Sequence, residues 1–230
     1  MHLPVTLKAE SVLEIGKFSA AKEGSQIPPG WKLQTFKAIP KTTTFSLVHE
    51  AGTVVLRAES RSSYAALVKN VHIDPREFPI IKWRWKTNGI YTKGDISRKD
   101  GDDYSARLYI LFEYQPEKLS TWERLQYQAA RLFFGEYPPT SAINYIWGNR
   151  SPLGSVVPNA YTKRTMMFVL QSGGHRLNTW IEENRNVYED YLKAFRSEPP
   201  FITAIAIAND SDNTGESSIS YFGDIELRKE

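Results

Sequence analysis

The chain has no cysteine among its 230 residues. This absence excludes disulfide bonds, thiolate metal sites and a cysteine nucleophile. No apolar run approaches the roughly 20 residues of a membrane-spanning helix, and the first residues, MHLPVTLKAE, lack the basic region and long apolar stretch of a signal peptide. We therefore expect no membrane span, and a periplasmic or secreted location is favoured only if a leader has been removed.

An excess of one charge is also missing, because 29 Lys+Arg face 26 Asp+Glu and the formal net charge is only +3. Nucleic-acid binding usually requires a larger imbalance, so no nucleic-acid partner is expected. A length of 230 residues with 41% hydrophobic residues is enough for one large core. We expect a single domain over residues 1–230, whose oligomeric state the sequence does not indicate.

Short runs that alternate apolar and polar residues fill most of the chain. In IIKWRWKT, Ile81, Trp83 and Trp85 fall on one face of a strand, and Lys82, Arg84 and Lys86 fall on the other. We interpret the basic face as an ordinary solvated face rather than a polyanion site. Further strands are expected at 54–59, 65–73, 104–114, 142–147, 164–171, 201–208 and 219–227, with weaker candidates at 5–15 and 31–36. This pattern predicts an all-β fold, a jelly-roll β-sandwich.

Two peripheral helices interrupt the strands. A helical insertion at about 118–135 begins with a capping box of Ser120 and Glu123. A second helix at about 186–196 has Asn186 and Glu189 as its start signal and two prolines beyond its end.

The order of several motifs carries a family resemblance. These motifs are IPPGWKLQTF, TVVLRAESRSSYAALVKNVHIDPREFPIIKWRWK, KDGDDYSARLYILFEY, INYIWGN, NDSDNTGES and the final SYFGDIEL. The chain resembles an uncharacterised bacterial family of unknown function, and its ending is similar to the jelly-roll sandwiches of carbohydrate-binding and galactose-binding-like domains. The resemblance implies a fold and no activity.

The stretch NDSDNTGES has part of the pattern of a calcium-binding loop. Asp210, Asp212 and Thr214 occupy its first, third and fifth positions and a glycine its sixth, but the twelfth position holds a tyrosine instead of glutamate. The missing bidentate ligand would therefore have to come from Glu216 or Asp224, and calcium is the candidate cofactor. The alternative is a solvated turn stabilised by Asx hydrogen bonds.

A second acidic cluster precedes the strand that carries Arg107. Asp102 and Asp103 could act with Arg107 to hold the vicinal hydroxyls of a sugar, because carboxylates accept and guanidinium groups donate hydrogen bonds. The alternative is an internal salt bridge that ties a loop to a strand. In a sandwich this loop could meet the loop of Asp210 and Asp212 at one end.

Aromatic residues make up 13% of the chain, and the apolar face of a sugar stacks well on such rings. Candidate stacking residues are Trp85, Tyr145, Trp147 and Trp180. The competing interpretation of Trp85 is a core residue, since it shares a strand face with Ile81 and Trp83.

These observations favour non-catalytic binding of a carbohydrate or cell-envelope polymer. The expected site consists of the two acidic loops, Arg107 and Asn213, with Trp85 or Trp147 as the stacking surface. The alternative is a glycoside hydrolase or polysaccharide lyase that uses Asp103 and Asp212 as acid and base. The sequence contains no nucleophile elbow, phosphate loop or dinucleotide fingerprint.

Overall fold

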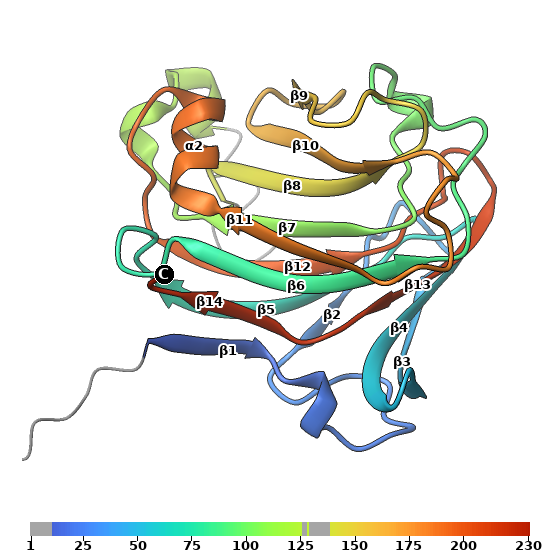
Figure 1. Cartoon of the computed structure of the whole chain (residues 1–230). Coiled ribbons are helices and arrows are strands. Elements are labelled where there is room, and N and C mark those ends of the chain that lie inside the picture. Colours follow the sequence, from blue (N-terminus) through green and yellow to red (C-terminus); the bar gives the residue numbers. More distant parts are fainter. Residues whose placement is uncertain (1–10, 126–127, 129–138) are drawn as a thin grey trace, which may run out of the picture.

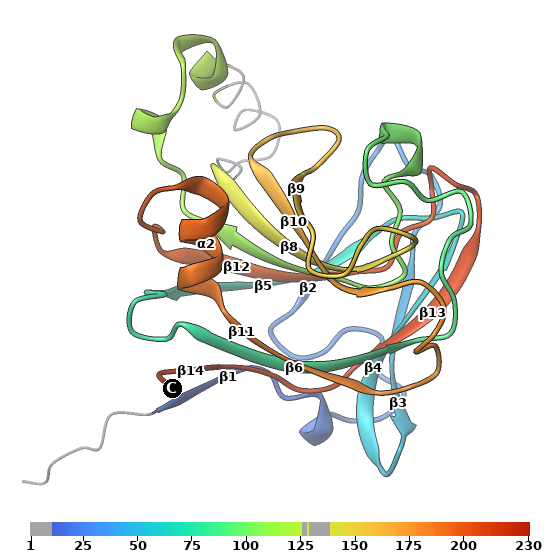
Figure 2. The ribbon, with the colours of Figure 1, turned by 45° about the horizontal axis from the view of Figure 1, so that its top comes forward.

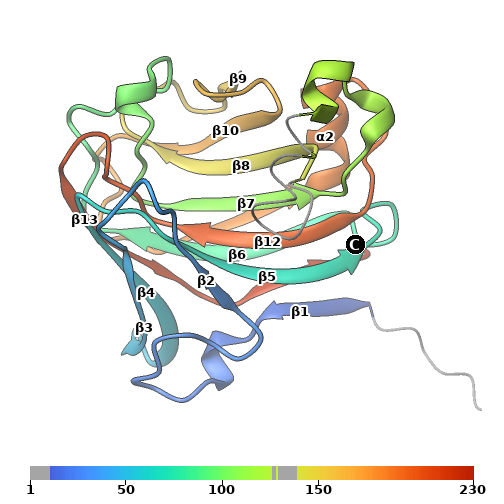
Figure 3. The ribbon, with the colours of Figure 1, turned by 180° about the vertical axis from the view of Figure 1, so that it is seen from behind.

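The computed structural model describes residues 11–125, 128 and 139–230. Two β-sheets lie face to face and form a jelly-roll sandwich (Figure 1). A view from behind shows the second sheet in front of the first (Figure 3). The predicted all-β sandwich is confirmed.

The first sheet contains seven strands, and its outer face is the surface described below. In spatial order they are β1 (Val12–Gly16), β14 (Ile225–Arg228), β6 (Ile80–Thr87), β13 (Ser217–Phe222), β4 (Thr53–Arg61) and β3 (Thr44–Glu50), and β11 (Ile181–Asn186) also pairs with β6. Neighbouring strands run antiparallel throughout this sheet.

The second sheet also contains seven strands. In spatial order they are β2 (Lys32–Gln34), β5 (Ala66–Ile73), β12 (Ile202–Ala208), β7 (Arg107–Phe112), β8 (Ser141–Gly148), β10 (Thr165–Ser172) and β9 (Val156–Pro158). β8 and β10 run parallel, whereas the other neighbours run antiparallel.

The core lies between the two sheets and is rich in aromatic rings. Trp85 of β6 lies 6.2 Å from Trp147 of β8, and Trp83 lies 5.3 Å from Tyr145, measured between ring centroids. The predicted alternation in β6 is confirmed, because Ile81, Trp83 and Trp85 are buried in this core. Each large apolar side chain that is fully buried contributes about 1.5–3 kcal/mol to stability.

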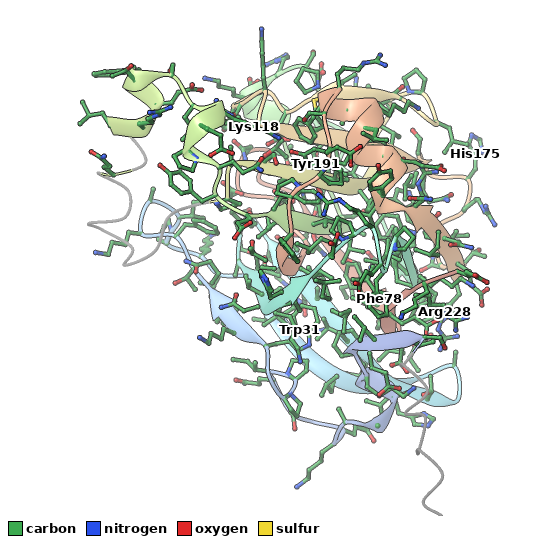
Figure 4. The ribbon with its side chains drawn as sticks, turned by 90° about the vertical axis from the view of Figure 1, so that its left-hand side faces the viewer. Trp31, Phe78, Lys118, His175, Tyr191 and Arg228 are labelled. Atoms are coloured by element: carbon green, nitrogen blue, oxygen red, sulfur yellow. The ribbon has the colours of Figure 1, made fainter. Side chains whose placement is uncertain are left out.

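Helices occupy the periphery, as expected. α2 (Val187–Phe195) begins after Asn186, whose side chain accepts a hydrogen bond from the backbone N–H of Glu189 at 3.0 Å. Tyr191 extends from α2 towards Phe112 of β7, with ring centroids 4.6 Å apart (Figure 4). Short 3-10 helices lie at Phe18–Ala20, Lys99–Gly101 and Pro116–Lys118.

The predicted capping box is confirmed. Glu123 accepts hydrogen bonds from the backbone N–H and hydroxyl of Ser120, and residues 121–125 are helical. The rest of the predicted insertion helix lies largely outside the described residues.

Strand boundaries differ from prediction at three places. β7 begins at Arg107 instead of Tyr104, because the backbone N–H of Tyr104 binds the side chain of Asp210 at 3.2 Å rather than a neighbouring strand. The last predicted strand is divided into β13 and β14 at Gly223 and Asp224. β3, β9 and β11 were not predicted, and β11 has the sequence IEENRN, which lacks the apolar alternation of a half-buried strand.

Candidate functional site

The two acidic loops meet in space. Both carboxylate oxygens of Asp103, in the loop before β7, are bound by the loop between β12 and β13. One accepts from the backbone N–H of Thr214 at 2.6 Å and the other from the side-chain amide of Asn213 at 3.0 Å. The hypothesis that these loops converge at one end of the sandwich therefore holds.

Arg107 lies inside this loop cluster and is closed off from solvent. Its guanidinium pairs with Asp102 at 3.2 Å and with Asp210, and only 2% of the residue is exposed. It also lies 4.6 Å from the ring centroid of Tyr104. Although burial lowers the pKa of Arg107, the charge of Asp210 raises it well above its ordinary value.

Asp210 is the more deeply buried of the two acids that pair with Arg107. Burial raises its pKa well above the ordinary value, and Arg107 opposes this shift. Asp102 also accepts from the side-chain amide of Asn159 at 2.7 Å. The salt-bridge interpretation is thus confirmed for Arg107 and Asp102. The expectation that Asp102, Asp103 and Arg107 offer their groups to a ligand is wrong, because all three are buried, Arg107 pairs with Asp102, and Asp103 is bound by Asn213 and Thr214.

Two of the predicted metal residues, Asp210 and Asp212, lie near a third acid, Asp103. One carboxylate oxygen each from Asp103, Asp210 and Asp212 lies within 4.8 Å of the others. Burial raises the pKa of Asp212, and the nearby charge of Asp103 adds to this shift. These three acids could hold a cation, and calcium stays a prediction.

Glu216 and Thr214, the other predicted metal residues, form hydrogen bonds with residues 92–93. The Glu216 carboxylate accepts from the backbone N–H groups of Thr92 at 3.1 Å and Lys93 at 2.9 Å, and the Thr214 carbonyl accepts from the Lys93 ammonium at 3.2 Å. The Glu216 carboxylate is thus directed at residues 92–93, and its role as a metal ligand stays a prediction. Asp103 was not predicted as a member of this acid cluster, since nothing in the local spacing connects it to the distant loop.

The predicted stacking surface is wrong. Trp85 and Tyr145 are 0% exposed and Trp147 is 1% exposed. Their polar atoms are also used internally: the Trp85 indole N–H donates to Glu183 at 3.0 Å and the Tyr145 hydroxyl donates to Asp190 at 2.7 Å. These rings fill the space between the sheets, so they offer no face to a sugar.

Of the four candidate aromatic residues, Trp180 is the one that is not buried. It precedes β11 and lies on the outer side of the first sheet, 6.4 Å from the ring of Tyr221. The Arg84 guanidinium lies 4.6 Å from the Trp180 centroid, and the Lys86 ammonium lies 4.6 Å from that of Tyr221.

A groove with a volume of about 760 Å³ lies beside these rings. It runs over the outer face of β6, β11 and β14, the face opposite the buried tryptophans, and Figure 2 shows these three strands next to one another. Arg228, labelled in Figure 4, belongs to its lining. The other lining residues used below are Lys82, Arg84, Glu182, Asn184 and Asp224.

The charged side chains of this groove fall into two groups. Asp224 accepts from Ser19 at 2.6 Å and pairs with Lys17, and Arg228 pairs with Glu226 at 2.5 Å. By contrast, the side chains of Lys82, Arg84 and Glu182 have no hydrogen bond or ion pair with any residue that the structure describes. The sequence located Lys82 and Arg84 on a wet face but gave no reason to single them out.

Comparison with known families decides where the chain belongs. Residues 29–226 match the family described as "Protein of unknown function (DUF3047)". The chain belongs to this family. The DUF3047 match covers most of the chain and confirms the resemblance to an uncharacterised family, whose description assigns no activity.

Several solved structures are similar to the chain. A family 11 carbohydrate-binding module from a cellulosomal cellulase of Clostridium thermocellum is 8% identical, with a TM-score of 0.46 and coverage of 94% of each chain. A family 29 carbohydrate-binding module is 10% identical, with a TM-score of 0.39 and coverage of 96% of this chain and 93% of that chain. An adhesin domain of Lys-gingipain from Porphyromonas gingivalis is 9% identical, with a TM-score of 0.39 and coverage of 95% and 98%.

No curated protein matches the chain. Within the part of the chain that the structure describes, no helix is long and apolar enough to cross a membrane.

Proposed function

We propose that this chain binds a carbohydrate polymer, such as one of the cell envelope, in the groove over β6, β11 and β14, without cleaving it. The observation that carries the proposal is the set of free side chains in the groove. Lys82 and Arg84 provide hydrogen-bond donors, Glu182 provides acceptors, and none of them is satisfied by a described residue. A sugar hydroxyl both donates and accepts, so a polyhydroxylated ligand can satisfy both kinds of group.

The position of these groups on strands supports binding of an extended ligand. Lys82 and Arg84 lie two residues apart on β6, and Glu182 and Asn184 lie opposite them on β11. Side chains two residues apart on a strand point the same way and are separated by about 7 Å. The groove therefore presents regularly spaced polar groups from a rigid sheet, which suits a polymer with repeated hydroxyl groups.

The catalytic alternative has weaker support. At least one oxygen of Asp103 lies within 4.8 Å of an oxygen of Asp212, whereas glycosidases separate their two carboxyl groups by roughly 5–10 Å. Asp103 is fully buried, and both of its oxygens are bound by Asn213 and Thr214. A group held in this way has no access to a glycosidic oxygen or to an attacking water.

The test is binding to a panel of polysaccharides, measured by affinity electrophoresis for soluble polymers and by depletion for insoluble ones. We expect retention on at least one polymer, with no release of reducing ends. The variant Lys82→Gln/Glu182→Gln should lose this retention, whereas Lys32→Gln, which removes an exposed charge from the second sheet, should keep it.

Besides absence of binding to every polymer, two results would overturn the proposal. One is retention that Lys82→Gln/Glu182→Gln leaves unchanged, because the groove would then not be the site. The other is release of reducing ends that is lost in Asp103→Asn and Asp212→Asn, which would favour the hydrolase.

A further inference from the structure

Arg84 and Glu182 form an open pair of opposite charges. They are direct partners in the antiparallel register of β6 and β11, so their side chains leave the same face of the sheet with Cβ atoms about 5 Å apart. Such neighbours commonly form a salt bridge, yet no ion pair joins these two. The arginine of the sequence-based hypothesis, Arg107, is in the opposite situation, since two carboxylates close around it.

Several other charged side chains of the first sheet form ion pairs, although Lys82 and its register partner Glu226 on β14 do not pair with each other. Arg57 pairs with Glu59 at 2.7 Å, Arg228 pairs with Glu226 at 2.5 Å, and Lys86 pairs with Glu50. Within the described residues of this sheet, both cross-strand pairs of opposite charge that stay open, Arg84–Glu182 and Lys82–Glu226, line the groove.

Two contacts hold Arg84 away from Glu182. Its guanidinium lies 4.6 Å from the centroid of the Trp180 ring, where a cation is attracted to the aromatic face. Its aliphatic part lies against Gly223, where an added Cβ would be only 2.6 Å from the Arg84 Cγ. The backbone N–H of Gly223 donates to the Arg84 carbonyl at 2.9 Å, which fixes this close approach.

We propose that the open pair Arg84–Glu182 recognises two neighbouring hydroxyl groups of one sugar ring. One hydroxyl oxygen accepts from the Arg84 guanidinium, and the adjacent hydroxyl donates to the Glu182 carboxylate. A vicinal diol thus bridges the donor and the acceptor and forms hydrogen bonds with both charged groups, which is the chemistry that Arg107 cannot provide. This inference rests on the proposed function and names its ligand class: polymers whose linkage leaves two adjacent ring hydroxyls free.

Sugars with different glycosidic linkages can test whether the pair recognises a vicinal diol. A 1,4-linked hexopyranose chain keeps the hydroxyls on C2 and C3, which are neighbours. The internal residues of a 1,3-linked chain keep those on C2 and C4, which are not neighbours. Its terminal residues still carry neighbouring hydroxyls, so the comparison uses long oligosaccharides in which internal residues predominate. Oligosaccharides of equal length from a 1,4-linked β-glucan, a 1,4-linked β-mannan and a 1,3-linked β-glucan therefore test the diol with little change in composition.

Isothermal titration calorimetry of these oligosaccharides should show binding of at least one 1,4-linked ligand and about tenfold weaker binding of the 1,3-linked one. Arg84→Gln and Glu182→Gln should each weaken the 1,4-linked ligand by about tenfold or more, with little further loss in the double variant, since both residues hold one diol. Arg84→Lys keeps the charge but loses the fork of donors, so it should also weaken binding. Arg57→Gln, which opens a closed pair on the same sheet, is the matched control and should bind normally.

The outcomes separate this inference from the proposed function. Equal binding of the 1,3-linked and 1,4-linked ligands, or binding unchanged in Arg84→Gln and Glu182→Gln, overturns the diol pair and leaves groove binding intact if Lys82→Gln still weakens it. Absence of binding to every oligosaccharide and polymer overturns both. Thermal denaturation of each variant excludes misfolding as the cause of a loss, and Arg84→Lys replaces Arg84→Gln if the latter unfolds.

Discussion

Replacement of Arg107 by methionine tests whether the acidic loops depend on one buried guanidinium. In the native protein Asp102 and Asp210 both pair with it, and all three residues are buried. Removing one partner of a buried ion pair typically costs 3–5 kcal/mol, because it leaves an uncompensated buried charge. For a domain of this size about 1 kcal/mol corresponds to 2–4 °C. We therefore expect Arg107→Met to lower the Tm by roughly 6–20 °C.

The stability loss in Arg107→Met should depend on pH in a definite direction. Asp210 already has a pKa raised above its ordinary value, and loss of Arg107 should raise that pKa further. A carboxyl group whose pKa is higher in the folded state binds more protons there, so it destabilises the fold increasingly as the pH rises above the unfolded-state value. The cost of Arg107→Met should thus be largest at neutral pH and shrink as the pH falls towards 4.

Differential scanning calorimetry between pH 4 and pH 8 is the assay. Arg57→Gln serves as the control, since a partly exposed pair such as Arg57–Glu59 is worth about 0–1 kcal/mol. A Tm loss in Arg107→Met no larger than in this control, or one that does not change with pH, would refute the view that buried charge compensation holds the loops together.

Three further outcomes follow from the same contacts. Asp212→Asn should raise the Tm in EDTA at neutral pH, because the raised pKa of the Asp212 carboxyl group marks an unfavourable charge. This gain should vanish below about pH 4, where the carboxyl group is protonated. An unchanged or lower Tm at pH 7 would contradict this prediction. Calcium at about a hundred times its dissociation constant should increase the free energy of unfolding by roughly 2.7 kcal/mol, which corresponds to a Tm rise of about 5–10 °C. Asp212→Asn should abolish this rise, and a Tm that is identical in EDTA and in excess calcium would contradict the metal prediction. Trp147→Ala should cost about 3–5 kcal/mol of stability, as its ring is buried between the sheets, and circular dichroism melts that show no loss would contradict its core position.

Local patterns in the sequence were sufficient for most of the elements and for the orientation of several strands. The alternation from Ile81 to Lys86 correctly separated the core face from the wet face of β6, because side chains on a strand alternate with period two. The caps at Ser120 and Asn186 were also found, since a cap depends on residues three positions apart. β11 was missed because its side chains do not alternate between apolar and polar.

The sequence by itself determined that the chain is a β-sandwich with acidic loops and a basic strand face. Only the tertiary structure decided which of two strand arginines, Arg84 or Arg107, has no carboxylate partner among the described residues. Arg107 and Arg84 look alike in sequence, each on an alternating strand, but loops from distant parts of the chain cover Arg107, whereas β11 and Gly223 leave Arg84 beside an open groove. The physical reason is that burial and charge pairing depend on which distant segments pack together, and local periodicity carries no information about those contacts.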